Sequence, residues 1–335
     1  MKLVSSDTIS ENLLELLSGL ELGTNGAKYV HLDIKERIKE ADHPLSFSLE
    51  RNNRLIANIT FCVRDTGYYL RYFTFSSAFQ SQGSKNKSAK RKPSQLEKEI
   101  SRVFQNLISN KPSFPLYAYI DYDNDRSRLF SERFGFENYS DIVSRTYSRI
   151  NPKKNQNITL IDDWEAISEE IKAAYGADEF YHEAHIKKGP YLVLNDDKGV
   201  MIACAKFSKV HWRIISLPGR YGSFLVKILP FIPFLNRLVK PKNHFFLVPD
   251  VVLTKNSSSG DLETLFDSAL NLFGVNSLIW FIDPNKPIYK EHRKTIKWGI
   301  LDKILGEKKV ALVTRNHKSQ YSEKRPVFVS AFDLI

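Results

Sequence analysis

The stretch from Leu116 to Phe136 constrains the fold of this chain more than any other part of the sequence. Residues 116–120 are apolar and aromatic, which is typical of a buried strand. Polar, turn-forming residues follow, and Ser127 is placed to cap a short helix. The apolar side of that helix would carry Leu129, Phe130 and Phe134. Gly135 is placed to end the helix in a left-handed conformation. The sequence therefore predicts a strand, a turn, a short helix and a further extended segment that begins at Phe136.

The spacing within this stretch resembles the C-terminal motif of the GNAT superfamily of N-acetyltransferases. In that family an Asn follows the fifth strand, a Tyr comes seven residues later, and a Gly-Phe pair comes eleven residues after the Asn. Asn124 and the pair Gly135-Phe136 match this pattern, whereas Ser131 occupies the position of the Tyr. The Tyr usually protonates the departing thiolate of coenzyme A, and a serine hydroxyl is a poor general acid. The resemblance thus implies the fold, with an altered acid position.

A second short motif lies where the family has its pyrophosphate loop. The family pattern is Gln or Arg, two residues, Gly, one residue, then a small residue, and here Gln80 and Gly83 match while Lys85 replaces the last position. In such a loop, backbone N–H groups and the start of the next helix bind phosphate oxygens. The resemblance implies pyrophosphate contacts from the following loop residues: Gln80, Gln82, Gly83, Ser84 and Lys85.

The resemblance also implies roles for residues near the acyl group. A backbone N–H near Phe75 or Ser76 would polarise the thioester carbonyl, and Asn124 would bind the pantetheine arm or steer the acceptor. Because Ser131 is a poor acid, Tyr122 or Tyr119 would have to replace it, and Tyr122 is the more exposed candidate. No carboxylate is evident as a base, although a water held by Asp121 is conceivable.

The order of predicted elements suits two α/β domains in tandem, each a mixed, mostly antiparallel sheet flanked by helices. In the first domain, residues 1–150, two helices precede a meander that ends at Phe75, and the closing strands lie at 139–149. Residues 151–157 are polar and contain Pro152, which is typical of a linker. Residues 158–335 repeat the order, with closing strands at 310–313 and 327–332. The family motifs are weaker in this second domain, where we expect a structural repeat.

An apolar insertion at about 208–243 interrupts the second domain. Its core, Phe224 to Leu235, is intensely apolar, contains Pro230 and Pro233, and is flanked by basic residues. The prolines break any continuous helix, and the run is too short to span a membrane. It is expected to form a cap over the inter-domain cleft or a surface for a protein partner; a contact with a membrane surface is the alternative.

Composition restricts the remaining choices. The formal net charge of +11 attracts polyanions, but no nucleic-acid-binding motif accompanies it, so nucleic acid is not an expected partner. Cys62 and Cys204 lie in apolar runs and are expected to be buried free thiols. The N-terminal residues lack the apolar core of a signal peptide, which favours a cytoplasmic protein. The spacing of His182, Glu183 and His185 is not that of a zinc-hydrolase helix, so we expect a solvated helix edge and no metal.

These observations predict an acyl-CoA-dependent N-acyltransferase, with acetyl-CoA as the expected co-substrate and a small-molecule or peptide amine as acceptor. The candidate catalytic residues are Tyr122, Ser131 and Asn124. Two alternatives stay open. One is a tandem-GNAT transferase that uses aminoacyl-tRNA, and the other is a non-catalytic binding module that kept the fold.

Overall fold

The computed structural model describes residues 2–23, 27–52, 54–75, 94–217, 219–255, 258–317 and 324–335. We call residues 2–150 the front half and residues 158–335 the second half. The elements of the front half are β1 (Lys2–Ser6), α1 (Glu11–Ser18), β2 (Lys28–His31), α2 (Ile34–Lys39), β3 (Pro44–Arg51), β4 (Arg54–Arg64), β5 (Gly67–Phe75), α4 (Gln95–Asn110), β6 (Leu116–Asp121), α5 (Asp125–Arg133) and β7 (Glu137–Ser148).

The second half has a similar alternation of strands and helices. Its elements are β8 (Ile158–Ile161), α6 (Glu165–Tyr175), β9 (Tyr191–Asn195), β10 (Met201–Ser216), α7 (Gly222–Ile228), η2 (Leu229–Phe231), α8 (Leu235–Leu238), β11 (His244–Thr254), α9 (Ser259–Phe273), β12 (Ser277–Ile282), α10 (Pro287–His292), α11 (Ile300–Leu305), β13 (Lys308–Arg315) and α12 (Ala331–Leu334).

Within the described residues, one 13-stranded mixed sheet runs through both halves, in the order β1-β3-β4-β5-β6-β13-β7-β12-β11-β10-β9-β8, with β2 added on β10. Each half receives a strand from the other. β13 pairs with β6 of the front half, β7 pairs with β12 of the second half, and β13 and β7 pair with each other. The predicted mixed α/β architecture is confirmed, and the exchange of strands joins the halves into one sheet.

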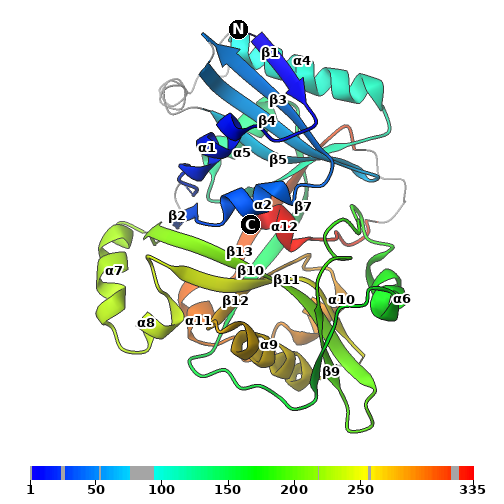
Figure 1. Ribbon diagram of the computed structural model, residues 1–335, viewed down its shortest axis with the longest axis vertical. Coiled ribbons are helices and arrows are strands. Elements are labelled where there is room, and N and C mark those ends of the chain that lie inside the picture. The colour runs from blue at the N-terminus through cyan, green and yellow to red at the C-terminus, as the bar shows by residue number, and fades with distance from the viewer. Residues whose placement is uncertain are drawn as a thin grey trace.

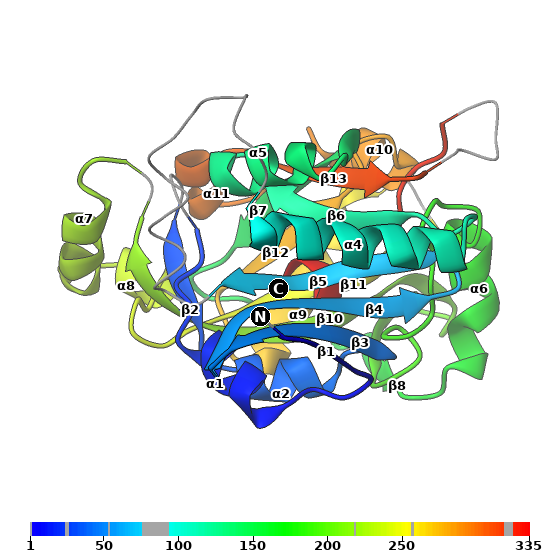
Figure 2. The same cartoon turned by 90° about the horizontal axis from the view of Figure 1, so that it is seen from above.

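Helices cover both faces of the sheet in the front half (Figure 2). α4 has Ile100 and Phe104 in a core with Phe61 and Leu116 of the sheet. α1 and α2 lie on the opposite face, where their leucine and isoleucine side chains pack with Leu55 and Tyr72. In the second half, the apolar side of α9 forms the largest core cluster together with β10, β11 and β12. This amphipathic packing fixes the faces on which the strand side chains emerge.

The stretch from Leu116 to Phe136 folds largely as expected, but its helix cap differs from the prediction. Asn124, and not Ser127, is the N-cap of α5: its side chain accepts a hydrogen bond from the Ser127 backbone N–H at 3.1 Å. Gly135 has φ of +73°, so the left-handed end of the helix is confirmed. Phe134 and Phe136 are buried in the core, whereas Leu129 is 56% exposed. The helix therefore turns its phenylalanines, but not Leu129, toward the sheet.

The predicted closing strand at 327–332 is wrong. Val327 forms an isolated bridge with Glu179, and the chain then turns into the short helix α12. The segment 324–335 lies between the two halves, where Figure 1 shows α12 at the centre of the molecule. Arg64, Tyr69 and Arg71 of the front half all bind its backbone or its Asp333 carboxylate. The C-terminal segment therefore connects the halves and does not close a sheet.

The expectation of a solvated edge at His182 and His185 is also wrong. His182 is 9% exposed, and the His185 ring stacks on Phe332 with its Nε2 at 2.9 Å from Oδ1 of Asp42. These histidines pack against the C-terminal segment. In the described residues, no group of three or more His, Cys, Asp or Glu side chains is arranged to hold a metal ion. Both cysteines are buried and free, as expected.

Candidate functional site

The two parallel neighbours β5 and β6 separate soon after they meet. They pair at Tyr68 with Leu116 and at Tyr69 with Tyr117, and no pairing joins them beyond these positions. β5 continues to Phe75 and β6 to Asp121 along diverging paths. Among the described residues, the backbones of β5 and β6 therefore face a gap beyond Tyr69 and Tyr117.

A bulge in β5 accompanies the separation. Thr60 of β4 pairs with Tyr72 and Phe61 pairs with Leu70, so Arg71 is the extra residue. A bulge places two consecutive side chains on one face of a strand. Leu70 and Phe73 pack in the core beneath α4, while Tyr72 packs with α1 and α2, and Arg71 contacts the C-terminal segment. Arg71 and Tyr72 therefore both project to the face opposite α4.

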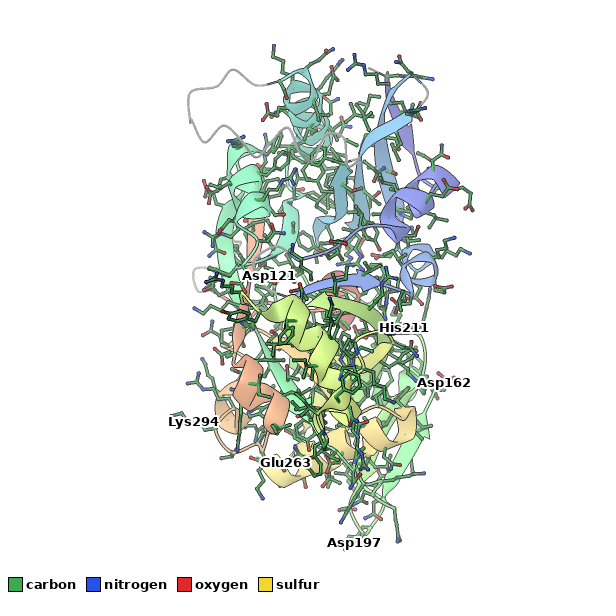
Figure 3. All side chains as sticks on the ribbon, turned by 90° about the vertical axis from the view of Figure 1, so that its left-hand side faces the viewer. Asp121, Asp162, Asp197, His211, Glu263 and Lys294 are labelled. Carbon is green, nitrogen blue, oxygen red and sulfur yellow. The ribbon has the colours of Figure 1, made fainter. Side chains whose placement is uncertain are left out.

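The gap opens into a large cavity of about 1890 Å³ that extends into the second half. Its upper walls are the diverging ends of β5 and β6, the start of α4 and one side of α5. Its lower walls come from β2, β10, β11 and β12 and from the helices α7, α8 and α11. Figure 3 shows Asp121, which ends β6, between the front half above and the α7 region below. The cavity thus links the two faces of the sheet through the gap.

Five of the residues that the sequence suggested for binding or catalysis line this cavity: Phe75, Tyr119, Asp121, Asn124 and Ser131. The Asn124 side-chain oxygen is used in capping α5, and the Ser131 hydroxyl donates to the Arg128 carbonyl at 2.8 Å. The remaining candidates in the loop, Ser76, Gln80, Gln82, Gly83, Ser84 and Lys85, lie outside the described residues.

Tyr122, the predicted replacement for the missing acid, makes its hydrogen bonds outside the cavity. The Tyr122 hydroxyl donates to Oδ1 of Asp141 at 2.6 Å and accepts from Asn138, and Tyr122 is not among the residues that line the cavity. The hydrogen bond to Asp141 raises the pKa of Tyr122. Tyr119 donates its hydroxyl to the Phe328 carbonyl at 3.2 Å. The geometry favours neither tyrosine as a proton donor.

The start of α4, where a phosphate group would be expected, is capped by its own residues. The Ser94 side chain accepts from the Glu97 N–H, and the Glu97 carboxylate accepts from the Ser94 N–H at 2.6 Å. Glu97 also lies 3.7 Å from a guanidinium nitrogen of Arg133. This carboxylate therefore occupies part of the positive end of the helix dipole.

On the face opposite α4, aromatic side chains from both halves form one wall of the cavity. Tyr29 of β2 stacks on Trp212 of β10 with ring centroids 3.8 Å apart, and the His31 ring lies 5.4 Å from that of Trp212. Burial, followed by the charges of Arg71 and Arg37, lowers the pKa of His31 to about 3, so its imidazole is neutral. Sequence reasoning missed this wall, because it depends on β2 of the front half pairing with β10 of the second half.

Several buried polar atoms in the residues lining this wall have no hydrogen-bond partner among the described residues. They are Nδ1 of His31, Nε1 of Trp212, Nε of Arg71 and the hydroxyls of Tyr72 and Thr74. A buried polar atom without a partner costs free energy, so each of these atoms is available to bond a polar group in the cavity. Asp121 stands at the same gap, and desolvation by its surroundings raises the pKa of its carboxyl group.

The lower end of the cavity is an apolar chamber. α7, η2 and α8 contribute Leu225, Leu229, Ile232 and Leu235, and α11 contributes Leu301, Ile304 and Leu305. Leu229 and Leu301 are buried in one core cluster, which holds the insertion against the second half. One side of the apolar insertion therefore lines the cavity.

The second half repeats the separated pair of strands, but there the gap is filled. β11 and β12 pair in parallel at Leu247 and Leu278, and β11 has its own bulge at Asp250. The Asp250 carboxylate accepts hydrogen bonds from the Ser330 hydroxyl and the Ala331 N–H, at 3.0 and 2.8 Å. Asp283, beyond the end of β12, accepts from the Val327 N–H at 2.9 Å. The C-terminal segment thus occupies the second gap, while the first stays open to the cavity.

Comparisons with known proteins agree with this architecture. No protein-family model matches the sequence, and a search of curated proteins finds no match. Among solved structures, N-myristoyltransferase from Saccharomyces cerevisiae with bound myristoyl-CoA matches with a TM-score of 0.57 and 10% sequence identity, over 95% of this chain and 83% of that one. A tandem GNAT protein from the clavulanic acid biosynthesis pathway matches with a TM-score of 0.53 and 9% identity, over 95% and 100% of the two chains.

These similarities extend over nearly the whole chain at very low sequence identity, so they concern the fold. The two bulged strands, each separated from a parallel neighbour, agree with that similarity. The chain is therefore a protein of the GNAT fold, with its two halves joined through one sheet.

Proposed function

We propose that this protein is an acyl-CoA-dependent N-acyltransferase and that the acyl-CoA lies in the gap between β5 and β6. The observation that carries the proposal is that this gap opens directly into the large cavity, whereas the equivalent gap in the second half is filled by the chain itself. The pantetheine arm would take the place of a strand beside β5 and pair with its backbone groups. Phe75, Asn124 and Ser131 line that path.

The reaction proposed is direct transfer. The acceptor nitrogen attacks the thioester carbonyl carbon, the negative charge moves to the carbonyl oxygen, and the C–S bond then breaks to release the thiolate of coenzyme A. A backbone N–H of β5 beyond the Arg71 bulge would stabilise the oxyanion, since such fixed donors need no reorganisation. The amine must lose a proton, and we assign this step to Asp121, whose raised pKa makes it a stronger base than an ordinary Asp.

The acceptor would approach from the aromatic wall of Tyr29, His31 and Trp212. Nδ1 of the neutral His31 imidazole lies 3.9 Å from Oδ1 of Asp33 and has no hydrogen bond in the described residues. With the ring protonated at Nε2, this nitrogen can accept a hydrogen bond from the amine N–H. His31 would therefore position the amine, and the proton would go to Asp121. Indole and phenol rings beside it suit an amine that carries a positive charge before it reacts.

The shape of the cavity favours an acyl group longer than acetyl. The chamber beneath α7, η2 and α8 is lined by leucine and isoleucine side chains, and burying each methylene of an acyl chain there contributes about 0.8 kcal/mol. The fold neighbour from Saccharomyces cerevisiae binds myristoyl-CoA, which supports the same choice. Acetyl-CoA, the donor expected from sequence, would leave most of this chamber empty.

Binding of a series of ligands tests the proposal. Coenzyme A, acetyl-CoA, octanoyl-CoA and myristoyl-CoA would each be titrated into the full chain by calorimetry, with thermal shift as a second readout. We expect tighter binding as the chain lengthens. Ile304→Trp, which fills the chamber from a side chain that is 61% exposed, should weaken the longest ligand at least tenfold and leave coenzyme A unaffected.

Leu272→Trp, on α9 and outside the cavity, is the matched control and should change nothing. Equal affinity for all four ligands would overturn the long-chain proposal. If no acyl-CoA binds, the acyltransferase proposal fails. Stabilisation by charged tRNA would then support the aminoacyl-tRNA alternative, and no response to any of these ligands would support a non-catalytic binding module.

A further inference from the structure

The insertion that covers the chamber has a second side, which faces solvent. Tyr221, Phe224, Phe231 and Phe234 are 66%, 61%, 81% and 63% exposed, and we call these residues the aromatic edge. They come from α7, from η2 and from the turns around them, within a short length of chain. Single exposed apolar residues are common on protein surfaces, but several large aromatic side chains close together mark an interaction site.

Rigid local structure holds the aromatic edge outward. Gly222 begins α7 so close to the chain that a Cβ atom there would lie 1.7 Å from the Leu217 carbonyl oxygen. Phe234 has φ of +69°, a conformation that a bulky residue rarely adopts. On the inner side, Leu229 and Leu238 are 7% and 2% exposed in the cluster that contains Leu301. The buried leucines anchor the insertion while the phenylalanines stay in solvent.

The charge around the aromatic edge has one sign. No Asp or Glu occurs between Asp197 and Asp250 in the sequence. Five basic residues next to or between the aromatic residues are exposed: Arg220, Lys227, Arg237, Lys240 and Lys242. Figure 1 shows α7 at the left edge of the molecule, beside the end of β10. The insertion therefore combines exposed aromatic rings with basic residues and contains no acidic residue of its own.

We propose that the aromatic edge docks the protein on an anionic lipid bilayer, with the phenylalanines in the interfacial region and the basic residues against the headgroups. Aromatic side chains with flanking Lys and Arg are the combination that favours this interface. A second copy of the chain is a poorer partner, because it would bring the same positive charges together without any acid to pair with them.

Docking in this way would bring the membrane next to the chamber, since the same helices form both. Leu225 lines the cavity and is 42% exposed, so it lies where the two sides of α7 meet. None of the helices in the described ranges has the length and apolar character needed to cross a bilayer. The contact proposed is therefore peripheral and reversible, and it requires no bound acyl-CoA.

Co-sedimentation of the full chain with vesicles tests the proposal. Phosphatidylcholine vesicles would be compared with vesicles that contain 30 mol% phosphatidylglycerol, at low and high salt. We expect binding to the anionic vesicles alone, with the partition coefficient falling as salt screens the basic residues. The double variant Phe231→Ser/Phe234→Ser should lose at least tenfold in partitioning, and Lys227→Glu/Arg237→Glu should lose a similar amount.

Leu272→Ser is the matched control, because Leu272 is 39% exposed on α9, away from the aromatic edge. Each variant must keep the thermal unfolding temperature of the parent, which separates lost binding from lost folding. Equal binding to neutral vesicles, or unchanged binding of the phenylalanine variant, would overturn the proposal. Dimerisation that increases with protein concentration and is abolished in the phenylalanine variant would also overturn it. Binding of tRNA at this surface, with no binding to vesicles, would do the same. All these assays omit acyl-CoA, so they stand whether or not the chain is an acyltransferase.

Discussion

The guanidinium of Arg64 donates from Nη2 to Oδ1 of Asp333 at 2.7 Å, and both side chains are 2% exposed. Arg64 also binds Asp42 and donates to the Tyr117 hydroxyl. This ion pair joins a strand of the front half to the segment that fills the gap in the second half. It therefore couples the folding of the two halves through a pair of charges that water does not reach.

Replacing Asp333 by Ala should strongly destabilise the protein. The change leaves the Arg64 charge buried without one of its carboxylates, and breaking a buried pair in this way typically costs about 3–5 kcal/mol. The free energy of unfolding from urea titration measures the effect. Asp197→Ala, in an exposed turn, is the control and should stay within about 0.5 kcal/mol of the parent. A loss below about 1 kcal/mol for Asp333→Ala would show that the pair is replaceable.

The stability of the protein should depend on pH through His31. Its pKa is about 3 in the folded protein against an ordinary value of 6.5, so between these values the unfolded chain binds more protons at this site. The folding free energy that depends on neutral His31 is present above pH 6.5 and is lost as pH falls. Between the two pKa values, the slope of the unfolding free energy against pH approaches about 1.4 kcal/mol per pH unit. In the variant His31→Gln this dependence is removed, so its free energy of unfolding should change less between pH 7 and pH 5 than that of the parent. Parallel profiles for the two proteins would contradict the assignment.

Replacing Asp121 by Asn should slow acyl transfer and leave acyl-CoA binding almost unchanged. General base catalysis typically contributes about a hundredfold or more to the rate, and the amide cannot take a proton from the acceptor amine. The release of free coenzyme A thiol, with an amine found by screening a library, measures the rate. Asp162→Asn is the control, since Figure 3 shows Asp162 on the opposite side of the molecule from Asp121. The rate deficit should shrink at high pH, where more of the free amine is already deprotonated; a deficit independent of pH would argue against a base.

Each chain should bind one molecule of acyl-CoA. The gap between β5 and β6 is open, but the gap between β11 and β12 holds residues 327–331, whose backbone is bonded to Asp250 and Asp283. Calorimetric titration with myristoyl-CoA gives the stoichiometry directly. Two equivalents per chain would mean that the C-terminal segment leaves its place, and the variant Asp250→Ala would then favour the second site.

The sequence predicted local structure well because local structure depends on near neighbours. The spacing from Asn124 to Gly135 correctly located the turn, the helix and its left-handed end, since capping and backbone conformation act within one or two turns. Ser127 was misplaced as the cap by a few residues, because Asn124 and Ser127 both suit that role by type.

The candidate site could be predicted only in part. The strand at residues 116–120 was located, but which strand lies beside it is decided by pairing with residues 308–315, far along the chain. The wall of Tyr29, His31 and Trp212 likewise arises from contacts between β2 and β10. The segment 327–332 has the apolar composition of a strand, yet two of its backbone N–H groups bond the side chains of Asp250 and Asp283, which composition does not reveal.

The exchange of β7 and β13 has a consequence for how the protein is made. While the ribosome is still synthesising the second half, β6 has an unprotected edge, because its neighbour Lys308–Arg315 does not yet exist. The front half can therefore complete its sheet only after residues 308–315 have been synthesised, and β6 stays accessible to a chaperone until then. In the finished protein the same exchange interlocks the halves. A protease that cuts within residues 151–157 would leave two fragments that stay together, each holding a strand that the other needs.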